Sequence, residues 1–149
     1  MGEIIKRYYP NILVFFQFGI IGLMAFLVKG YFSSIYPFLI FLVGVSLGVW
    51  ALRHNRLGNF YIQPKLRENA KLVTSGIYKY IRHPMYLSVI IMTLSFVVAS
   101  FSWIEILLFL LLILVLWLKA KREEELWCLC DERYKEYQKR SKLFIPFLI

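Results

Sequence analysis

Cysteine and acidic residues are scarce in this 149-residue chain. The only two cysteines, Cys128 and Cys130, are too few for a disulfide framework and lack partners for a metal site. Nine Asp and Glu residues face 18 Lys and Arg residues, and 60% of the residues are hydrophobic, above the roughly 45–50% of a soluble domain. An excess of both apolar and basic residues points to a membrane rather than to nucleic acid.

Long uncharged runs occupy most of the chain. Residues 11–28 and 31–52 carry no charged side chain, and each is close to the ~20 residues that cross the hydrocarbon core of a bilayer. Residues 85–118 contain Glu105 as the only charge. As one helix they would be roughly 51 Å long, which exceeds a core of roughly 30 Å. A bend at residues 99–102 therefore divides this run into two spans, 85–99 and 103–118.

These four spans predict an all-α, polytopic integral membrane bundle in which the last two spans form a tight hairpin. A helix is expected in the C-terminal tail. No repeat or second unit is visible, so we predict one domain over residues 1–149. Two details concern the spans themselves. Glu105 is expected at the outer interface, and Gly19, Gly22, Gly44 and Gly48 are spaced to let the first two spans approach closely.

Fifteen of the 18 basic residues lie in the loop of residues 53–84 and in the tail of residues 119–149. The positive-inside rule places both segments, and both termini, in the cytosol. Pro84 suits the first turn of the third span, where its missing N–H costs nothing, so His83 stands at the cytosolic start of that helix. Because the hairpin returns to the same side, we expect His83 and the glutamates of residues 123–125 to be neighbours.

This junction combines unlike chemistries. A helix N-terminus with free N–H groups suits an anion, carboxylates suit a cation, and aromatic rings suit flat or cationic groups. A ligand with both a carboxylate and a positive centre, such as S-adenosylmethionine, would fit. By themselves the same residues also permit a plainer interpretation, with His83 as a helix-start residue at the interface and the glutamates as surface partners of basic residues, such as Lys119 with Glu123.

Residues 72–86, LVTSGIYKYIRHPMY, are followed by EEE at 123–125, YKEY at 134–137 and FIP at 144–146. This combination resembles the isoprenylcysteine carboxyl methyltransferase and phospholipid methyltransferase superfamily over residues 63–146. The resemblance implies a multi-pass membrane methyltransferase that uses S-adenosylmethionine at the cytosolic face. It also implies a lipid-like or prenylated acceptor that enters from the bilayer, with membrane lipids as its surroundings and no role for nucleic acid or a metal.

The resemblance further implies which residues contact the cofactor, in the loop, at the start of the third span and after the last span. These are Gln63, Leu72, Val73, Tyr78, His83, Pro84, Met85, Tyr86 and Glu124. Either Glu123 or Glu124 takes the place of the family glutamate, because the register is open by one residue. The catalytic candidates that the family pattern implies are Glu123, Lys119 and Arg122. Lys119 stands where the family has an arginine that orients the substrate.

A lysine lacks the bidentate fork that arginine offers to a carboxylate, so the acceptor stays open. The carboxylate of an isoprenylcysteine-type substrate is our first expectation, and an ethanolamine lipid or a small thiol is the alternative. Two further classes remain from the sequence alone. Sterol reductases that bind NADPH carry a similar Arg-His-Pro-x-Tyr segment, and a non-enzymatic membrane protein could share the scaffold.

Overall fold

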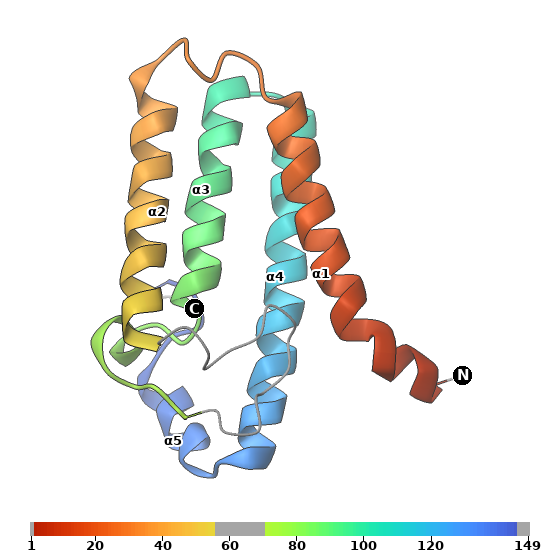
Figure 1. Ribbon diagram of the computed structural model, residues 1–149, viewed down its shortest axis with the longest axis vertical. Helices are drawn as coiled ribbons and strands as arrows, with labels where there is room; N and C mark the ends of the chain where they lie inside the picture. Colours follow the sequence, from red (N-terminus) through yellow and green to blue (C-terminus); the bar gives the residue numbers. More distant parts are fainter. Residues whose placement is uncertain (1, 56–70, 146–149) are drawn as a thin grey trace.

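The computed structural model describes residues 2–55 and 71–145, with side chains from Tyr8 onward (Figure 1). Its elements are α1 (Gly2–Leu27), α2 (Ile35–Asn55), the 3₁₀ helix η1 (Gly76–Lys79), α3 (Pro84–Ser100), α4 (Trp103–Cys130) and α5 (Arg133–Arg140). The described residues contain no strand, only an isolated parallel bridge between Ile81 and Lys142. The all-helical class predicted from the sequence is confirmed.

Within the described residues, three helices are long and apolar enough to cross a membrane, namely Tyr8–Leu27 within α1, α2 and α4. Helix α3 has 17 residues, which gives a length of roughly 26 Å, and it is therefore a shorter apolar helix. Helix α4 has 28 residues and ends at Cys130. The predicted span of residues 103–118 lies within α4, and the charged residues that follow continue the same helix for about three more turns.

The predicted bend between the last two spans is confirmed. Phe101 adopts a left-handed conformation with φ of 44° and its N–H donates to the carbonyl of Val97, which ends α3. Ser102 then begins α4, because its hydroxyl accepts a hydrogen bond of 3.3 Å from the N–H of Ile104. Figure 1 shows α3 and α4 side by side as a hairpin.

Helix α2 packs against α3, whereas α1 packs against α4. A Cβ atom added to Gly44 would lie 2.6 Å from Met92 Cγ, and one added to Gly48 would lie 2.6 Å from Ser88 Oγ. Gly19 and Gly22 of α1 have nothing within 4 Å at the equivalent position. The prediction that these glycines join the first two spans was wrong. Small residues permit a close approach between helices, but they do not select the partner.

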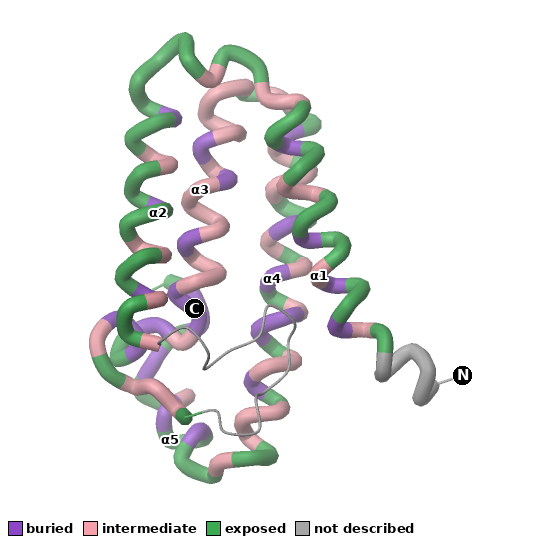
Figure 2. The backbone as a smooth tube through the Cα atoms, in the orientation of Figure 1, coloured by how far each residue is buried: buried purple, intermediate pink, exposed green. Residues whose placement is uncertain are grey.

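The outward faces of α1, α2 and α4 carry exposed apolar residues, and Figure 2 shows the green stretches on α1 and α2. Such a belt is expected where lipid replaces water as the surroundings. Glu105 lies in the first turn of α4, near the predicted outer end, but it is only 1% exposed. Its carboxylate oxygens form no hydrogen bond with any described residue, so the expected contact with the interface is replaced by burial.

Candidate active site

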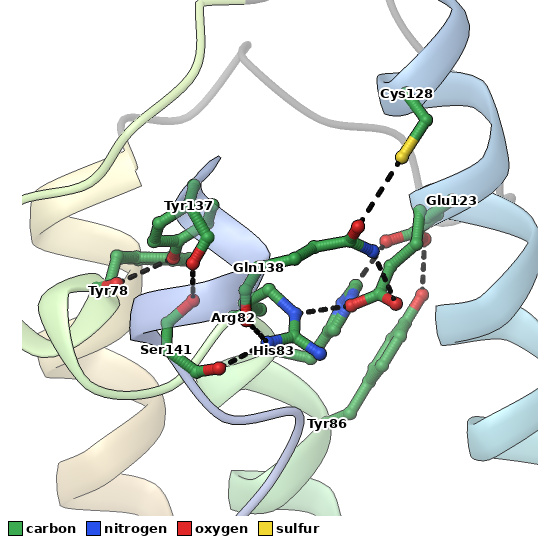
Figure 3. Close-up of polar contacts among 10 residues, drawn as sticks. Tyr78, Arg82, His83, Tyr86, Glu123, Cys128, Tyr137, Gln138 and Ser141 are labelled. Carbon is green, nitrogen blue, oxygen red and sulfur yellow. Dashed lines mark hydrogen bonds and ion pairs between the residues drawn. The ribbon is translucent and has the colours of Figure 1, made fainter. Parts of the chain in front are cut away.

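The start of α3 and the polar end of α4 meet at one end of the bundle, and His83 lies between two glutamates there (Figure 3). His83 Nδ1 is 3.5 Å from Glu123 Oε2, and His83 Nε2 is 3.5 Å from Glu124 Oε1. The predicted proximity of His83 to the glutamates is therefore confirmed. The hairpin produces it, because both helix ends return to the same side.

The His83 ring is 8% exposed, and its Nε2 atom forms no hydrogen bond with any described residue. Burial lowers the pKa of His83, but hydrogen bonding and charge from Glu123 and Glu124 outweigh burial and raise the pKa above the ordinary 6.5. The imidazole also stacks on the ring of Tyr86, with centroids 5.4 Å apart and planes 3° apart. Both ring nitrogens of His83 therefore face a carboxylate, and that of Glu123 is the more exposed of the two.

The two glutamates differ in their surroundings. Glu124 accepts a hydrogen bond of 2.5 Å from Arg82 Nε and one of 3.1 Å from Gln138 Nε2, and its side chain is 5% exposed. Glu123 accepts a hydrogen bond from the Tyr86 hydroxyl, and its side chain is 19% exposed. The carboxylate of Glu124 is therefore occupied by contacts within the protein, whereas that of Glu123 remains partly accessible.

Arg82 was absent from our sequence-based candidates. Its Nε donates to Glu124, while its Nη1 donates to the carbonyls of Gln138, at 3.2 Å, and Ser141. Arg82 thus joins α4 to the end of α5 and to the tail that follows. Two features of the sequence could have identified Arg82. It directly precedes His83, and its positive charge is complementary to the two glutamates.

The tail runs beside the segment that leads into α3. Arg82 N–H donates to the Lys142 carbonyl at 2.8 Å, and His83 N–H donates to the Leu143 carbonyl at 3.1 Å. These two N–H groups are therefore not free for an anion, contrary to the expectation of an open helix start. The tail also brings in Phe144, whose ring centroid is 6.2 Å from His83 and 6.5 Å from Tyr86. Phe144 forms an aromatic wall beside the His83–Tyr86 stack.

Lys119 reaches the same site from α4. It is 1% exposed, its ammonium donates to Gln17 Oε1 of α1, and its Nζ lies 5.2 Å from the centroid of the Tyr86 ring. The contact with Gln17 joins α1 to the site and was not anticipated from the sequence. Arg122 does not join the site around His83. Its guanidinium forms an ion pair of 3.1 Å with Glu125 instead.

Tyr78 lies beside the site rather than in contact with His83 (Figure 3). Its carbonyl accepts a hydrogen bond of 2.5 Å from the Tyr137 hydroxyl. Burial raises the pKa of Tyr78 to about 12, with a partly opposing hydrogen bond from Asn55. This tyrosine is therefore neutral at physiological pH and supports the loop through packing and its backbone.

The remaining predicted cofactor residues lie around Tyr78 and at the start of α3. Val73 and Met85 pack against the buried cluster that contains Ile77 and Tyr78. Pro84 is buried as the first residue of α3, as predicted, and Leu72 is half-buried. Gln63 lies outside the described residues. Among the described residues, no group of His, Cys, Asp and Glu side chains could hold a metal ion.

An apolar helical bundle with a buried cluster of charged residues at one end defines an integral membrane protein with a candidate active site. The profile of the phospholipid methyltransferase family matches residues 32–135, more than half of the chain. The protein belongs to this family, which is part of the superfamily that includes the isoprenylcysteine carboxyl methyltransferases. A comparison with curated proteins found no match. Family membership supports a membrane methyltransferase activity.

Proposed function

We propose that this protein transfers a methyl group from S-adenosylmethionine to a lipid-like acceptor at the membrane, and that the acceptor group is the carboxylate of an isoprenylcysteine-type substrate. The observation that carries the proposal is the buried His83 between Glu123 and Glu124, with the rings of Tyr86 and Phe144 beside it. Family membership supports the reaction class.

The residues present fit the cofactor. The accessible carboxylate of Glu123 suits a positive centre, and a charged His83 suits a carboxylate. The rings of Tyr86 and Phe144 offer aromatic surfaces for a flat group such as a purine. When bound, S-adenosylmethionine supplies an activated methyl group that needs no further activation by the protein.

The task left to the protein is to align the two reactants and to exclude water. The aromatic wall of Tyr86 and Phe144 excludes water on one side. Lys119, held by Gln17 and lying over the Tyr86 ring, attracts an anionic acceptor toward the site. A carboxylate acceptor carries no proton to be removed, so the reaction requires no general base from the protein.

Methylation of an ethanolamine lipid is the second candidate function, and the family match favours it. A protonated amine must lose a proton before it can attack a methyl group, and Glu123 is the accessible carboxylate that could accept it. The buried charge of Lys119 opposes this acceptor, because two cations in one site repel each other. This repulsion is our reason for ranking the carboxylate acceptor first.

We also propose that both termini and the active site face the cytosol. The start of α1, the polar end of α4 and α5 lie at the same end of the bundle (Figure 1). The sequence has seven basic residues within 53–84 and eight within 119–149, and the positive-inside rule assigns such segments to the cytosol.

Calorimetric titration of the purified protein with S-adenosylmethionine and, separately, with NADPH tests the proposal. We expect binding of S-adenosylmethionine, weakened at least about tenfold by Glu123→Gln, since a charge-assisted contact contributes about 1.5–3 kcal/mol. Glu136→Gln, which changes an exposed glutamate of α5, is the matched control and should bind normally. Binding of NADPH alone would favour a reductase, and binding of neither would favour a non-enzymatic protein.

A radiolabelled methyl-transfer screen then distinguishes the acceptors. We expect label in a prenylcysteine analogue and in neither an ethanolamine lipid nor a small thiol. Label in the ethanolamine lipid alone would overturn the carboxylate assignment while leaving the methyltransferase assignment intact.

A further inference from the structure

A second polar site lies on the face of α4 that points away from His83. It is a groove of about 320 Å³ between α4 and the cytosolic part of α1. The groove is lined by Tyr9, Trp117, Leu118, Lys121, Arg122 and Glu125. Because helix positions three and four apart share a face, the lining residues of α4 form one side of the helix, whereas Leu116, Lys119 and Ala120 are buried on the other side.

The charges in this groove leave one cation without a partner. Arg122 is neutralised by Glu125 through the ion pair of 3.1 Å. Lys121 is exposed, and its Nζ lies 5.7 Å from the centroid of the Trp117 ring. Within the described part of the chain, no carboxylate forms an ion pair with Lys121. The groove therefore carries a net charge of +1 that is centred on Lys121.

The groove also lies where lipid headgroups are expected. Trp117 is 40% exposed, and it follows the exposed apolar residues Leu110 and Leu114 along α4. Tryptophan and tyrosine rings concentrate at the boundary between acyl chains and headgroups. Cationic side chains just beyond that boundary attract the anionic lipids of the cytosolic leaflet. A phospholipid could thus place its acyl chains along α4 and its phosphate beside Lys121.

We propose that this groove binds the phosphate of an anionic membrane phospholipid, with Lys121 as its principal cation and Trp117 and Tyr9 beside the glycerol region. A net −1 headgroup balances the net +1 of the groove. A zwitterionic headgroup fits less well, because its ammonium would need a carboxylate and Glu125 is already paired with Arg122. The site is separate from the proposed active site, since α4 lies between the two.

Native mass spectrometry of the full chain tests this site. The protein is mixed in detergent with phosphatidylglycerol or with phosphatidylcholine of the same acyl chains, and the lipid that it retains after release from the detergent is measured. We expect the wild-type protein to retain phosphatidylglycerol, and Lys121→Gln to weaken this retention about fivefold, as one surface cation contributes about that factor. Trp117→Leu should weaken the retention of both lipids, because it removes the ring but no charge.

Lys135→Gln is the matched control, because Lys135 is an exposed lysine of α5 outside the groove. It removes the same charge and should retain phosphatidylglycerol normally. Equal losses in Lys121→Gln and Lys135→Gln would overturn the proposal in favour of general attraction to the basic face. Equal retention of phosphatidylcholine, or displacement of the lipid by millimolar inorganic phosphate, would also contradict it.

The binding of S-adenosylmethionine is expected to be unchanged in Lys121→Gln. This second measurement shows that the variant is folded. It also separates failure of the lipid site from failure of the proposed methyltransferase function.

Discussion

His83 is the residue on which the charges of the site converge. It lies 3.5 Å from a carboxylate oxygen on each side, and its ring is stacked on Tyr86. Two adjacent glutamates, one of them buried, would repel each other without a cation nearby, and His83 and Arg82 provide that positive charge. The same arrangement that stabilises the glutamates therefore raises the pKa of His83 above its ordinary value.

This charge state predicts how stability depends on pH. Because the pKa of His83 is raised in the folded protein, its contribution is fully present below the unfolded value of about 6.5 and is lost as pH rises through the folded value. We expect the melting temperature of the detergent-solubilised protein to fall as pH rises above about 6.5. His83→Gln should flatten this part of the profile, whereas His54→Gln, at an exposed histidine, should not. An identical fall in His83→Gln would contradict the assignment.

Arg82 and Arg133 provide a matched pair of arginines in ion pairs. The Arg82 side chain is 12% exposed and donates to Glu124 and to two carbonyls, whereas that of Arg133 is 81% exposed and pairs with Asp131. We expect Arg82→Lys to lower the free energy of unfolding by about 2 kcal/mol, since lysine cannot serve three acceptors from one planar fork.

Arg133→Lys should change the free energy of unfolding by less than about 0.5 kcal/mol, because exposed ion pairs contribute little. Reversible unfolding in mixed detergent micelles measures both variants. Similar effects of the two substitutions would contradict the role of Arg82 in joining the tail to α4.

Helices α1, α2 and α4 each combine an exposed apolar side with a distinct inner contact. Helix α4 is the longest of them, and it spans the apolar region, contacts α1 through Lys119 and Gln17, and carries both glutamates of the site. Helix α3 is short because the left-handed Phe101 ends it at one side and Pro84 begins it at the other. The site forms where the start of this short helix meets the polar extension of the long one.

The contact between α2 and α3 depends on Gly44. A methyl group there would lie 2.6 Å from Met92 Cγ and 2.8 Å from the Met92 backbone nitrogen, and the backbone atom cannot move aside without a shift of the helix. We expect Gly44→Ala to destabilise the protein by about 1–3 kcal/mol, as overpacking does. Gly22→Ala, where nothing lies within 4 Å, should have no effect or should be slightly stabilising. Thermal unfolding of both variants in one detergent makes the comparison, and equal melting temperatures would contradict the packing.

The molecule as a whole is a helical bundle in which neighbouring helices follow the order α2, α3, α4 and α1 (Figure 1). The start of α1, the polar end of α4 and α5 lie at one end, and the turns between α1 and α2 and between α3 and α4 lie at the other. This asymmetry is the basis for the proposed orientation in the membrane.

The two native cysteines allow this orientation to be tested. Cys130 is exposed at the end of α4, so a membrane-impermeant maleimide should label it in inverted vesicles and not in intact cells. Ser33→Cys, placed in the exposed turn before α2 of a variant without the native cysteines, should show the opposite pattern. Labelling of Cys130 from outside intact cells would reverse the proposed orientation.

Much of the site was predictable because its residues occur in short local patterns. The segment that contains Tyr78, His83 and Tyr86 was identified from the sequence, and the hairpin implied that the glutamates would be close. Arg82, Gln17 and Phe144 were missed because their roles depend on contacts with segments 42 or more positions away in the sequence. The distinction between Glu123 and Glu124 likewise required the positions of Tyr86 and Gln138.

The sequence by itself determined the helical class, the apolar segments, the bend of the hairpin and the side of the bundle on which charge gathers. These properties follow from hydropathy and charge along the chain, which each segment carries locally. Only the tertiary structure decided that α2 pairs with α3, that Lys119 is buried against Gln17, and that Arg122 lines the groove between α4 and α1. Lipid is as apolar as the helices it surrounds, so hydrophobicity does not select partners. Close packing and buried polar contacts between distant segments determine which helices pair.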